Sequence, residues 1–141
     1  GKAQLFGTKA HPIVHGRFDR GPSYPTVTIY NHLDVQPAEG PDWKTQPFDF
    51  IREGDKYRGR GTTDDKGPAI TALFGARYAY DKNVPLNIHF LWELEEEIGS
   101  PHFESTIRAN AKEFATDSVV VSDTVWVSRA RPYPRLEPAR A

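Results

Sequence analysis

The sequence predicts an α/β fold with a mostly parallel sheet and helices on both faces of that sheet. Short β-branched and aromatic runs alternate along the chain with segments whose apolar residues recur at helical spacing. The 141 residues suffice for one domain, and 3 Trp, 6 Tyr and 8 Phe supply apolar surface for its core. We therefore expect βαβ crossovers built around a single core.

Three apolar runs are expected to form the strands of this sheet. Residues 26–30 are β-branched and aromatic, residues 86–92 follow the same pattern, and residues 118–122 contain three consecutive valines. Residues 50–57 predict a hairpin that turns at 53–55, where a glycine lies between two acids. The sequence thus places one small hairpin outside the main sheet.

Two segments are expected to be helical. The first begins at Gly67 and ends near 81–83, because Pro68 suits a first helical turn and small apolar residues recur up to Ala79. The second covers residues 101–114. These helices would cover the sheet.

The remaining segments contain few signals of regular structure. Residues 1–25 are rich in turn signals with one extended stretch at 12–16, and residues 36–47 predict a loop. Residues 129–141 hold three prolines and four arginines, which predicts an irregular tail. The chain is thus expected to be one domain over 1–141.

The composition argues against several classes of protein. A formal net charge of -1 gives no electrostatic reason to expect nucleic acid or a membrane surface as a partner. Eighteen consecutive apolar residues occur nowhere, and no signal peptide is recognised, so a cytoplasmic protein is expected. The chain has no cysteine, which excludes disulfides and thiolate ligands.

Four polar clusters follow predicted strands or precede the first helix. They occupy residues 31–34, 63–67, 93–97 and 122–123. The carboxyl ends of parallel strands face one crevice in an open α/β sheet. The clusters are therefore expected to converge, which would bring one imidazole and several carboxylates together.

His32 and Asp34 are separated by one residue at the end of a predicted strand. On an extended backbone this spacing directs both side chains to the same face. A carboxylate beside a metal-bound imidazole can fix the orientation of the ring. The alternative interpretation is a turn histidine beside an Asx-type cap.

Asp64 and Asp65 are adjacent acids just before the first predicted helix. One aspartate could bridge two cations while the other turns away, and the alternative is a helix cap with a first-turn acid. Gly59 and Gly61 would let the backbone approach closely, but the phosphate-binding pattern Gly-x-Gly-x-x-Gly fails at Asp64.

The acids at 93–97 follow a predicted buried strand directly. A charge run is usually a solvated face, yet like charges at the end of a sheet repel unless a cation is present. Of two adjacent glutamates, one can bind metal while the next acts as a general base. Asp123 repeats the pattern, and histidine with carboxylates but no cysteine favours zinc or manganese.

At these residues the sequence resembles the di-zinc aminoacylase and carboxypeptidase family. The family includes acetylornithine deacetylase, succinyl-diaminopimelate desuccinylase and the carnosinase-type dipeptidases. The matching segments are residues 31–38, 58–68, 93–100 and 121–123. The wording His-Leu-Asp-Val-Gln-Pro-Ala with Asp-Asp-Lys-Gly-Pro is most similar to the dipeptidase branch, and the resemblance covers about residues 12–131.

The resemblance implies two zinc ions, with Mn²⁺ or Co²⁺ as other possible metals. By position, His32, Asp64 and Asp123 match the ligands of the first zinc. Asp64 also matches the carboxylate that bridges both metals, and Glu97 matches a ligand of the second.

The resemblance also implies a reaction. Glu96 matches the general base, and Asp34 matches the acid that supports His32. The implied activity is hydrolysis of the amide bond of dipeptides or N-acyl amino acids through a metal-activated water.

The sequence departs from the family pattern toward its C-terminus. No histidine follows His102, so the second zinc lacks its imidazole, and the family's lid with its homodimer interface is absent from these residues. The resemblance therefore implies a truncated N-terminal part of the catalytic domain. Two alternatives stay open: an inactive fragment that at most binds metal, and a metal-free α/β binding module whose acids cap helices.

Overall fold

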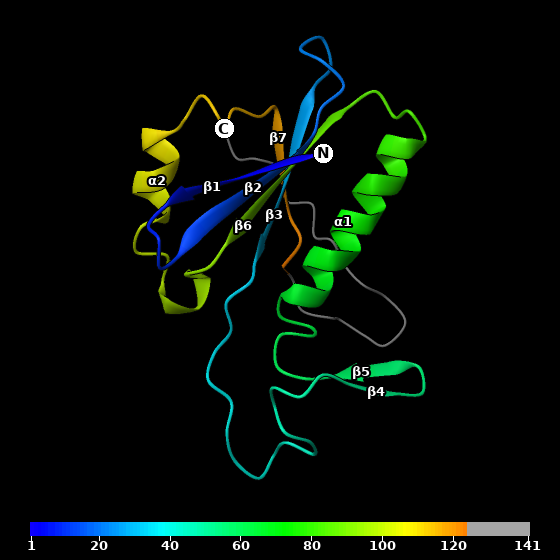
Figure 1. Ribbon diagram of the computed structural model, residues 1–141, viewed down its shortest axis with the longest axis vertical. Coiled ribbons are helices and arrows are strands. Elements are labelled where there is room, and N and C mark those ends of the chain that lie inside the picture. Colours follow the sequence, from blue (N-terminus) through cyan, green and yellow to red (C-terminus); the bar gives the residue numbers. More distant parts are fainter. Residues whose placement is uncertain (124–141) are drawn as a thin grey trace, which may run out of the picture.

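The computed structural model describes residues 1–123, which form a five-stranded mixed sheet with one α-helix on each face (Figure 1). The strand order is β1-β2-β6-β3-β7. The strands are β1 (Lys2–Gly7), β2 (Pro12–Phe18), β3 (Thr26–His32), β6 (Asn87–Glu93) and β7 (Ser118–Val121). The predicted α/β class is confirmed. Residues 129–141, where an irregular tail is expected, lie outside the described residues.

The parallel part of the sheet consists of β6, β3 and β7, the three strands that the sequence predicts. β3 lies between the other two and pairs in parallel with both, so that Ile29 has Phe90 on one side and Val120 on the other. All three strands therefore end at the same edge of the sheet. This is the edge at which the polar clusters were expected to converge.

β2 and β1 extend the sheet with antiparallel pairings to β6 and to each other. The extended stretch expected at 12–16 is confirmed and reaches Phe18. β1 was not expected, because residues 1–25 carry mainly turn signals. Only Phe6 of this strand is partly buried, so β1 has almost no apolar alternation to reveal it.

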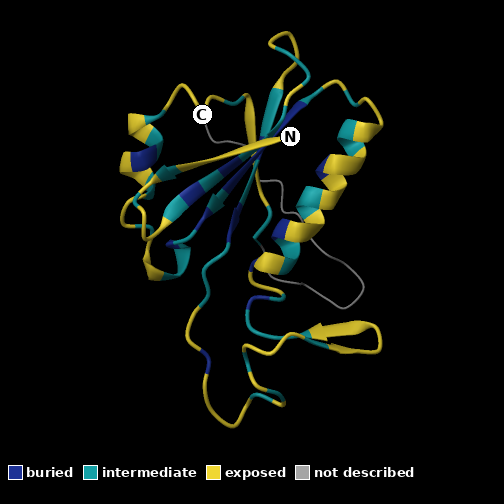
Figure 2. Ribbon diagram, in the orientation of Figure 1, coloured by how far each residue is buried: buried dark blue, intermediate teal, exposed yellow. Residues whose placement is uncertain are grey.

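One face of the sheet packs against α1 (Lys66–Asp81). The buried core there consists of Ala76, Ile88 and Phe90, and Leu73 and Phe18 pack against it. The helix presents alanines to the sheet, which lets its backbone approach the larger side chains of β6. Figure 2 shows that burial is concentrated on β2, β3 and β6 and on the sheet side of this helix, whereas β1 and β7 are largely exposed.

The opposite face carries α2 (Phe103–Ala109), which is shorter than the helix predicted over 101–114. At its C-terminal end the side-chain amide of Asn110 donates to the Thr106 carbonyl oxygen at 2.9 Å. The Asn110 backbone N–H bonds instead to the Ile107 carbonyl oxygen at 3.2 Å. The side chain of Asn110 thus occupies the acceptor that a further α-helical turn would use.

The predicted hairpin is present as β4 (Ile51–Glu53) and β5 (Lys56–Arg58). Gly54 has a φ of 62°, which the two-residue turn requires. The hairpin and the loop before it project from the carboxyl edge of the sheet (Figure 1), and they are largely exposed (Figure 2). Within residues 1–123 we find no helix that is long and apolar enough to cross a membrane.

Two histidine side chains are buried on the α2 face of the sheet, and one of them contacts the exposed Asp19. The Nε2 atom of His15 lies 3.4 Å from Nδ1 of His89, and Nε2 of His89 lies 2.9 Å from Oδ1 of Asp19. The His15 ring also packs against Phe6 and Phe114. His15 is thus enclosed by aromatic side chains and by a second imidazole.

This environment predicts a loss of stability on acidification. Burial, together with His89 and Arg17, lowers the pKa of His15 from 6.5 to about 4. Between these pH values the unfolded chain binds a proton at His15 that the folded chain does not, so the free energy of unfolding falls as the pH drops from 7 to 4. We expect His15→Leu to show a smaller loss between pH 7 and pH 5, measured by thermal unfolding. Parallel curves for the parent and the variant would contradict this.

Candidate metal centre

The candidate site is built around His32, the last residue of β3. Its side chain is 1% exposed, because β3 lies between two parallel neighbours. Its Nδ1 atom lies 3.2 Å from the carbonyl oxygen of Asp34 and 3.4 Å from that residue's carboxylate. The opposite nitrogen, Nε2, faces the edge of the sheet. The alternative of a turn histidine is not what the structure shows, because His32 is a residue of β3.

Carboxylates from three other segments of the chain surround Nε2 of His32. Asp64 Oδ1 lies 2.9 Å away, Asp123 Oδ2 lies 3.8 Å away, and Glu96 Oε2 lies 3.9 Å away. These acids come from the segment before α1, from the end of β7 and from the segment after β6. The predicted convergence of the four polar clusters is therefore observed.

Two groups of side chains have the spacing to hold a cation. His32, Asp64 and Glu97 offer ligand atoms within 4.8 Å of one another, and His32, Asp65 and Asp123 form a second such group. Both groups combine one imidazole nitrogen with carboxylate oxygens, a donor set that suits zinc or manganese. Because the acids outnumber the imidazole, the site carries excess negative charge that a divalent cation would compensate.

The two adjacent aspartates point in different directions. Asp64 faces His32, whereas Asp65 is 0% exposed and accepts hydrogen bonds from Asn31 Nδ2 at 2.7 Å and from the His32 backbone N–H at 3.1 Å. Asp65 occupies the N-cap position of α1, but its side chain makes no capping hydrogen bond. The side chain of Asp65 thus holds the end of β3 and does not cap the helix.

A glycine allows the segment that carries Asp64 to approach the chain just after β3. Gly61 has a φ of 84°, and a Cβ atom at this position would lie 2.9 Å from Cγ1 of Val35. Only glycine combines this conformation with this contact at no steric cost. The close backbone approach expected at 59–61 is therefore present, and the Lys66 backbone N–H closes the turn on the Gly61 carbonyl oxygen at 3.0 Å.

Asp34 connects His32 to the glutamates. Its carboxylate accepts hydrogen bonds from the backbone N–H groups of Glu96, at 3.3 Å, and Glu97, at 2.9 Å. These residues begin η1 (Glu96–Ile98), a short 3₁₀ helix. An acid at a helix N-terminus satisfies free N–H groups and matches the local dipole. The backbone carbonyl of Asp34 therefore orients the imidazole, and its carboxylate holds both glutamates.

The acids at 93–97 do not form a solvated face. Glu93 is 2% exposed and accepts a hydrogen bond from the Tyr30 hydroxyl at 2.7 Å, and Glu95 is also buried. Glu96 and Glu97 are partly exposed and lie at the site. Sequence reasoning did not assign roles to Tyr30 or Glu93, because their pairing across strands leaves no local signal.

The crowding of acids perturbs the ionisation of the site. Burial, with the negative charges of Asp123 and Glu97, raises the pKa of Glu96 against the opposing effect of His32. Burial lowers the pKa of His32, but Asp123 and Asp64 outweigh it and raise that pKa overall. Burial also raises the pKa of Asp65 to about 6, although its hydrogen bonds oppose the shift. Glu96 and Asp65 thus hold their charge at a cost.

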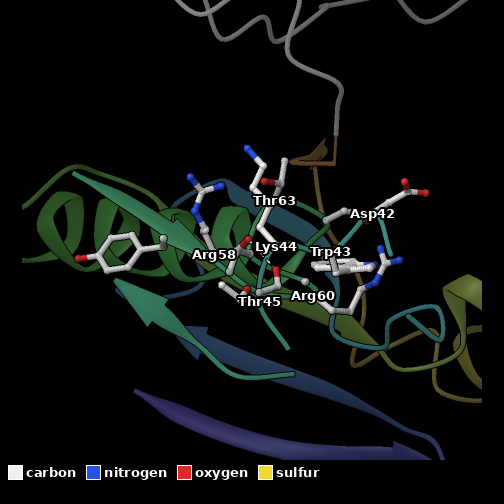
Figure 3. Close-up of a pocket in the computed structure, with 12 residues that line it drawn as sticks. Asp42, Trp43, Lys44, Thr45, Arg58, Arg60 and Thr63 are labelled. Carbon is white, nitrogen blue, oxygen red and sulfur yellow. Dashed lines mark hydrogen bonds between the residues drawn. The ribbon is translucent and has the colours of Figure 1, made fainter. Parts of the chain in front are cut away.

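A pocket of about 390 Å³ adjoins Asp64 between the loop at 42–45 and the segment at 57–64. Three of its lining side chains are cationic: Lys44, Arg58 and Arg60. In Figure 3 the guanidinium of Arg60 lies against the Trp43 ring, 5.2 Å from its centroid. The pocket gives room beside the carboxylates for a small polar group.

Comparison with known proteins defines the class. Peptidase family M20/M25/M40 matches residues 28–132, and the chain belongs to this family. The match includes every residue of the candidate centre.

Individual relatives are dipeptidases and a carboxypeptidase. The chain is 41% identical over 127 residues to the Cys-Gly metallodipeptidase dug1 of Schizosaccharomyces pombe, covering 86% of this chain and 27% of that protein. It is 36% identical over 126 residues to human Beta-Ala-His dipeptidase, covering 86% of this chain and 25% of that protein. The crystal structure of an M20 family metallo-carboxypeptidase from Sulfolobus solfataricus superimposes with a TM-score of 0.78 at 38% identity, covering 86% of this chain and 28% of that one. The chain thus spans about a quarter of the length of these relatives.

The buried hydrogen bonds of Asp65 predict a large effect of its removal. In Asp65→Ala the Asn31 amide and the His32 N–H lose a buried acceptor, so we expect the free energy of unfolding to fall by about 1–3 kcal/mol. Denaturant unfolding measures this change, with Asp42→Ala as the control because Asp42 is exposed. Equal destabilisation by the two substitutions would refute the anchoring role.

Proposed function

We propose that this chain supplies metal ligands and a general base to the active site of a metallopeptidase that hydrolyses the amide bond of dipeptides or N-acyl amino acids. One observation carries the proposal: a buried imidazole faces carboxylates that come from three other segments of the chain. Membership in the M20/M25/M40 peptidase family supports it. An arrangement that collects like charges with few local counter-charges is expected at a functional site and rarely elsewhere.

The proposed metals are two zinc ions, with Mn²⁺ or Co²⁺ as other possible occupants. His32, Asp64 and Asp123 would hold one ion, and Asp64 would share a carboxylate with a second ion that Glu97 also binds. The contact of Nδ1 with Asp34 supports this, because it turns Nε2 toward the surrounding carboxylates as the nitrogen that could bind a metal. Asp34 is proposed to keep that orientation during the reaction.

Glu96 is proposed as the general base. A bound divalent ion acts as a Lewis acid that acidifies water and polarises a carbonyl group. The Glu96 carboxylate is partly exposed and lies 3.9 Å from His32 Nε2, so it borders the space where substrate would react. Its raised pKa favours a group that accepts a proton from water and passes it to the departing amine.

The substrate class follows from the relatives and from the pocket. The matched proteins are named for Cys-Gly and Beta-Ala-His dipeptides, both of which are small and polar. The pocket beside Asp64 has the polar lining that such a ligand needs. We propose a small peptide or N-acyl amino acid as the substrate, and neither nucleic acid nor a membrane as a partner.

A second candidate function is metal binding without catalysis. Both possible metal groups among residues 1–123 use the same imidazole, that of His32. A second cation held by carboxylates alone would bind more weakly than one that also has an imidazole ligand. In this case the chain would bind metal but turn over no peptide.

Metal content tests the proposed centre directly. We expect elemental analysis of the dialysed protein to give about one or two zinc ions per chain, and almost none in Asp64→Ala, because that substitution removes the shared carboxylate. Asp42→Ala removes an acid from the same pocket without touching His32, so it should keep the parental zinc content. Metal-free parent protein would overturn the proposed function.

Hydrolysis tests the role of Glu96. We expect Glu96→Ala to lower kcat for Cys-Gly or β-Ala-His about 10²- to 10⁴-fold, because a positioned general base contributes that much. The zinc content of this variant should stay near that of the parent. Full activity in Glu96→Ala would show that the base is misassigned, whereas a parent that binds zinc and hydrolyses nothing would favour the second candidate function.

A further inference from the structure

We propose that Glu95 and His102 form a clamp that positions Glu96 and Glu97 for metal binding and proton transfer. Neither residue belongs to the groups that could hold a metal. The inference rests on the proposed function, because it assigns a positioning role within the same site. It assigns a role to Glu95, which precedes Glu96 and Glu97 directly but whose carboxylate contacts His102.

Glu95 uses all of its acceptors to close one short loop. Its carboxylate lies 2.9 Å from Nδ1 of His102 and accepts the His102 backbone N–H at 3.1 Å. Its carbonyl oxygen accepts the backbone N–H groups of Ser100, at 2.8 Å, and Ile98, at 3.3 Å. The carboxylate acceptor requires the tautomer of His102 that carries its proton on Nδ1. Glu95 therefore ties the start of residues 95–102 to their end.

The loop needs such a clamp because packing does not hold it. Ile98, the one large apolar residue of η1, is 66% exposed. Gly99 and Ser100 follow with φ values of 86° and 53°, a conformation that costs energy for a non-glycine residue. Hydrogen bonds must maintain this backbone path. The carboxylate of Asp34 holds its first turn, and the contact between Glu95 and His102 holds its end.

The chemistry of Glu95 favours positioning over simple stabilisation. Its side chain is 3% exposed, and a buried carboxylate is expensive to desolvate even when it is paired. An apolar side chain would fill the same space at a lower cost. A buried acid that contacts both the ring and the backbone N–H of His102 instead fixes one geometry of the residues beside it, which is what two adjacent metal-site glutamates require.

The test compares variants of the exposed partner, since Glu95→Ala can unfold the chain. Zn²⁺ affinity, the visible spectrum of bound Co²⁺ and the thermal midpoint are measured for the parent, His102→Ala and His102→Asn. We expect His102→Ala to weaken Zn²⁺ binding about 10- to 100-fold and to alter the Co²⁺ spectrum. The thermal midpoint should also fall, because the buried Glu95 carboxylate loses one hydrogen-bond partner. His102→Asn should restore both metal readouts, because its amide can donate from nearly the position of Nδ1.

The matched control is Glu104→Ala, which breaks the exposed ion pair between Glu104 and Arg108 on α2, the helix that begins just after His102. It should bind Zn²⁺ like the parent. The clamp is overturned if His102→Ala keeps the parental affinity and spectrum, or if it and Glu104→Ala weaken binding equally. If the parent protein itself binds no metal, both the proposed function and the clamp are overturned. This outcome differs from a failure of the clamp alone, in which the parent binds Zn²⁺ and His102→Ala binds it equally well.

Discussion

The crowding of carboxylates around the imidazole of His32 is the constraint on which the rest of the structure depends. Three acids from separate segments lie within 4 Å of Nε2, although acids at such distances repel one another. Two further acids beside this cluster, Asp34 and Asp65, are held by fixed N–H donors. Two backbone N–H groups point at Asp34, and the Asn31 amide and one backbone N–H point at Asp65. The backbone at this edge of the sheet therefore follows a path that places N–H donors beside the buried or partly buried carboxylates.

The acids fall into two sets with different functions. Asp65, Glu93 and Glu95 are buried and hydrogen-bonded, whereas the acids next to them along the chain are partly or fully exposed at the site. In each case a buried acid lies one or three positions before or after an acid that faces the imidazole. The buried set anchors the backbone, and the exposed set presents oxygen atoms. This division explains why acidic runs occur where a single acid would supply the ligand.

The sequence predicts most elements of the fold and the convergence of the site residues, but it does not predict the buried hydrogen bonds that hold them. Apolar runs predict β3, β6 and β7, and small apolar residues at helical spacing predict α1. β6 is buried and β3 partly so, whereas the residues of β7 are exposed within the described part of the chain. β1 escapes detection because solvent covers most of it, and α2 ends early because of one asparagine side chain. The convergence around His32 is predictable because parallel strands share an edge. The pairings of Asn31 with Asp65 and of Tyr30 with Glu93 are not, since each joins residues more than 30 positions apart.

The strands that carry His32 and precede Asp123 differ in the number of their neighbours in the sheet. The hydrogen bonds of Asn31 supply the support that the end of β7 lacks within the described sheet. His32 belongs to a strand with a neighbour on each side, whereas Asp123 follows β7, which pairs only with β3 within residues 1–123. The amide of Asn31 donates both to Asp65 and to the Ser122 carbonyl oxygen, and Ser122 in turn donates its N–H to Tyr30. One buried amide thereby ties the segment that carries Asp64 and the segment that carries Asp123 to the strand that carries His32. The relative placement of the acids depends on this neutral side chain as much as on their own charges.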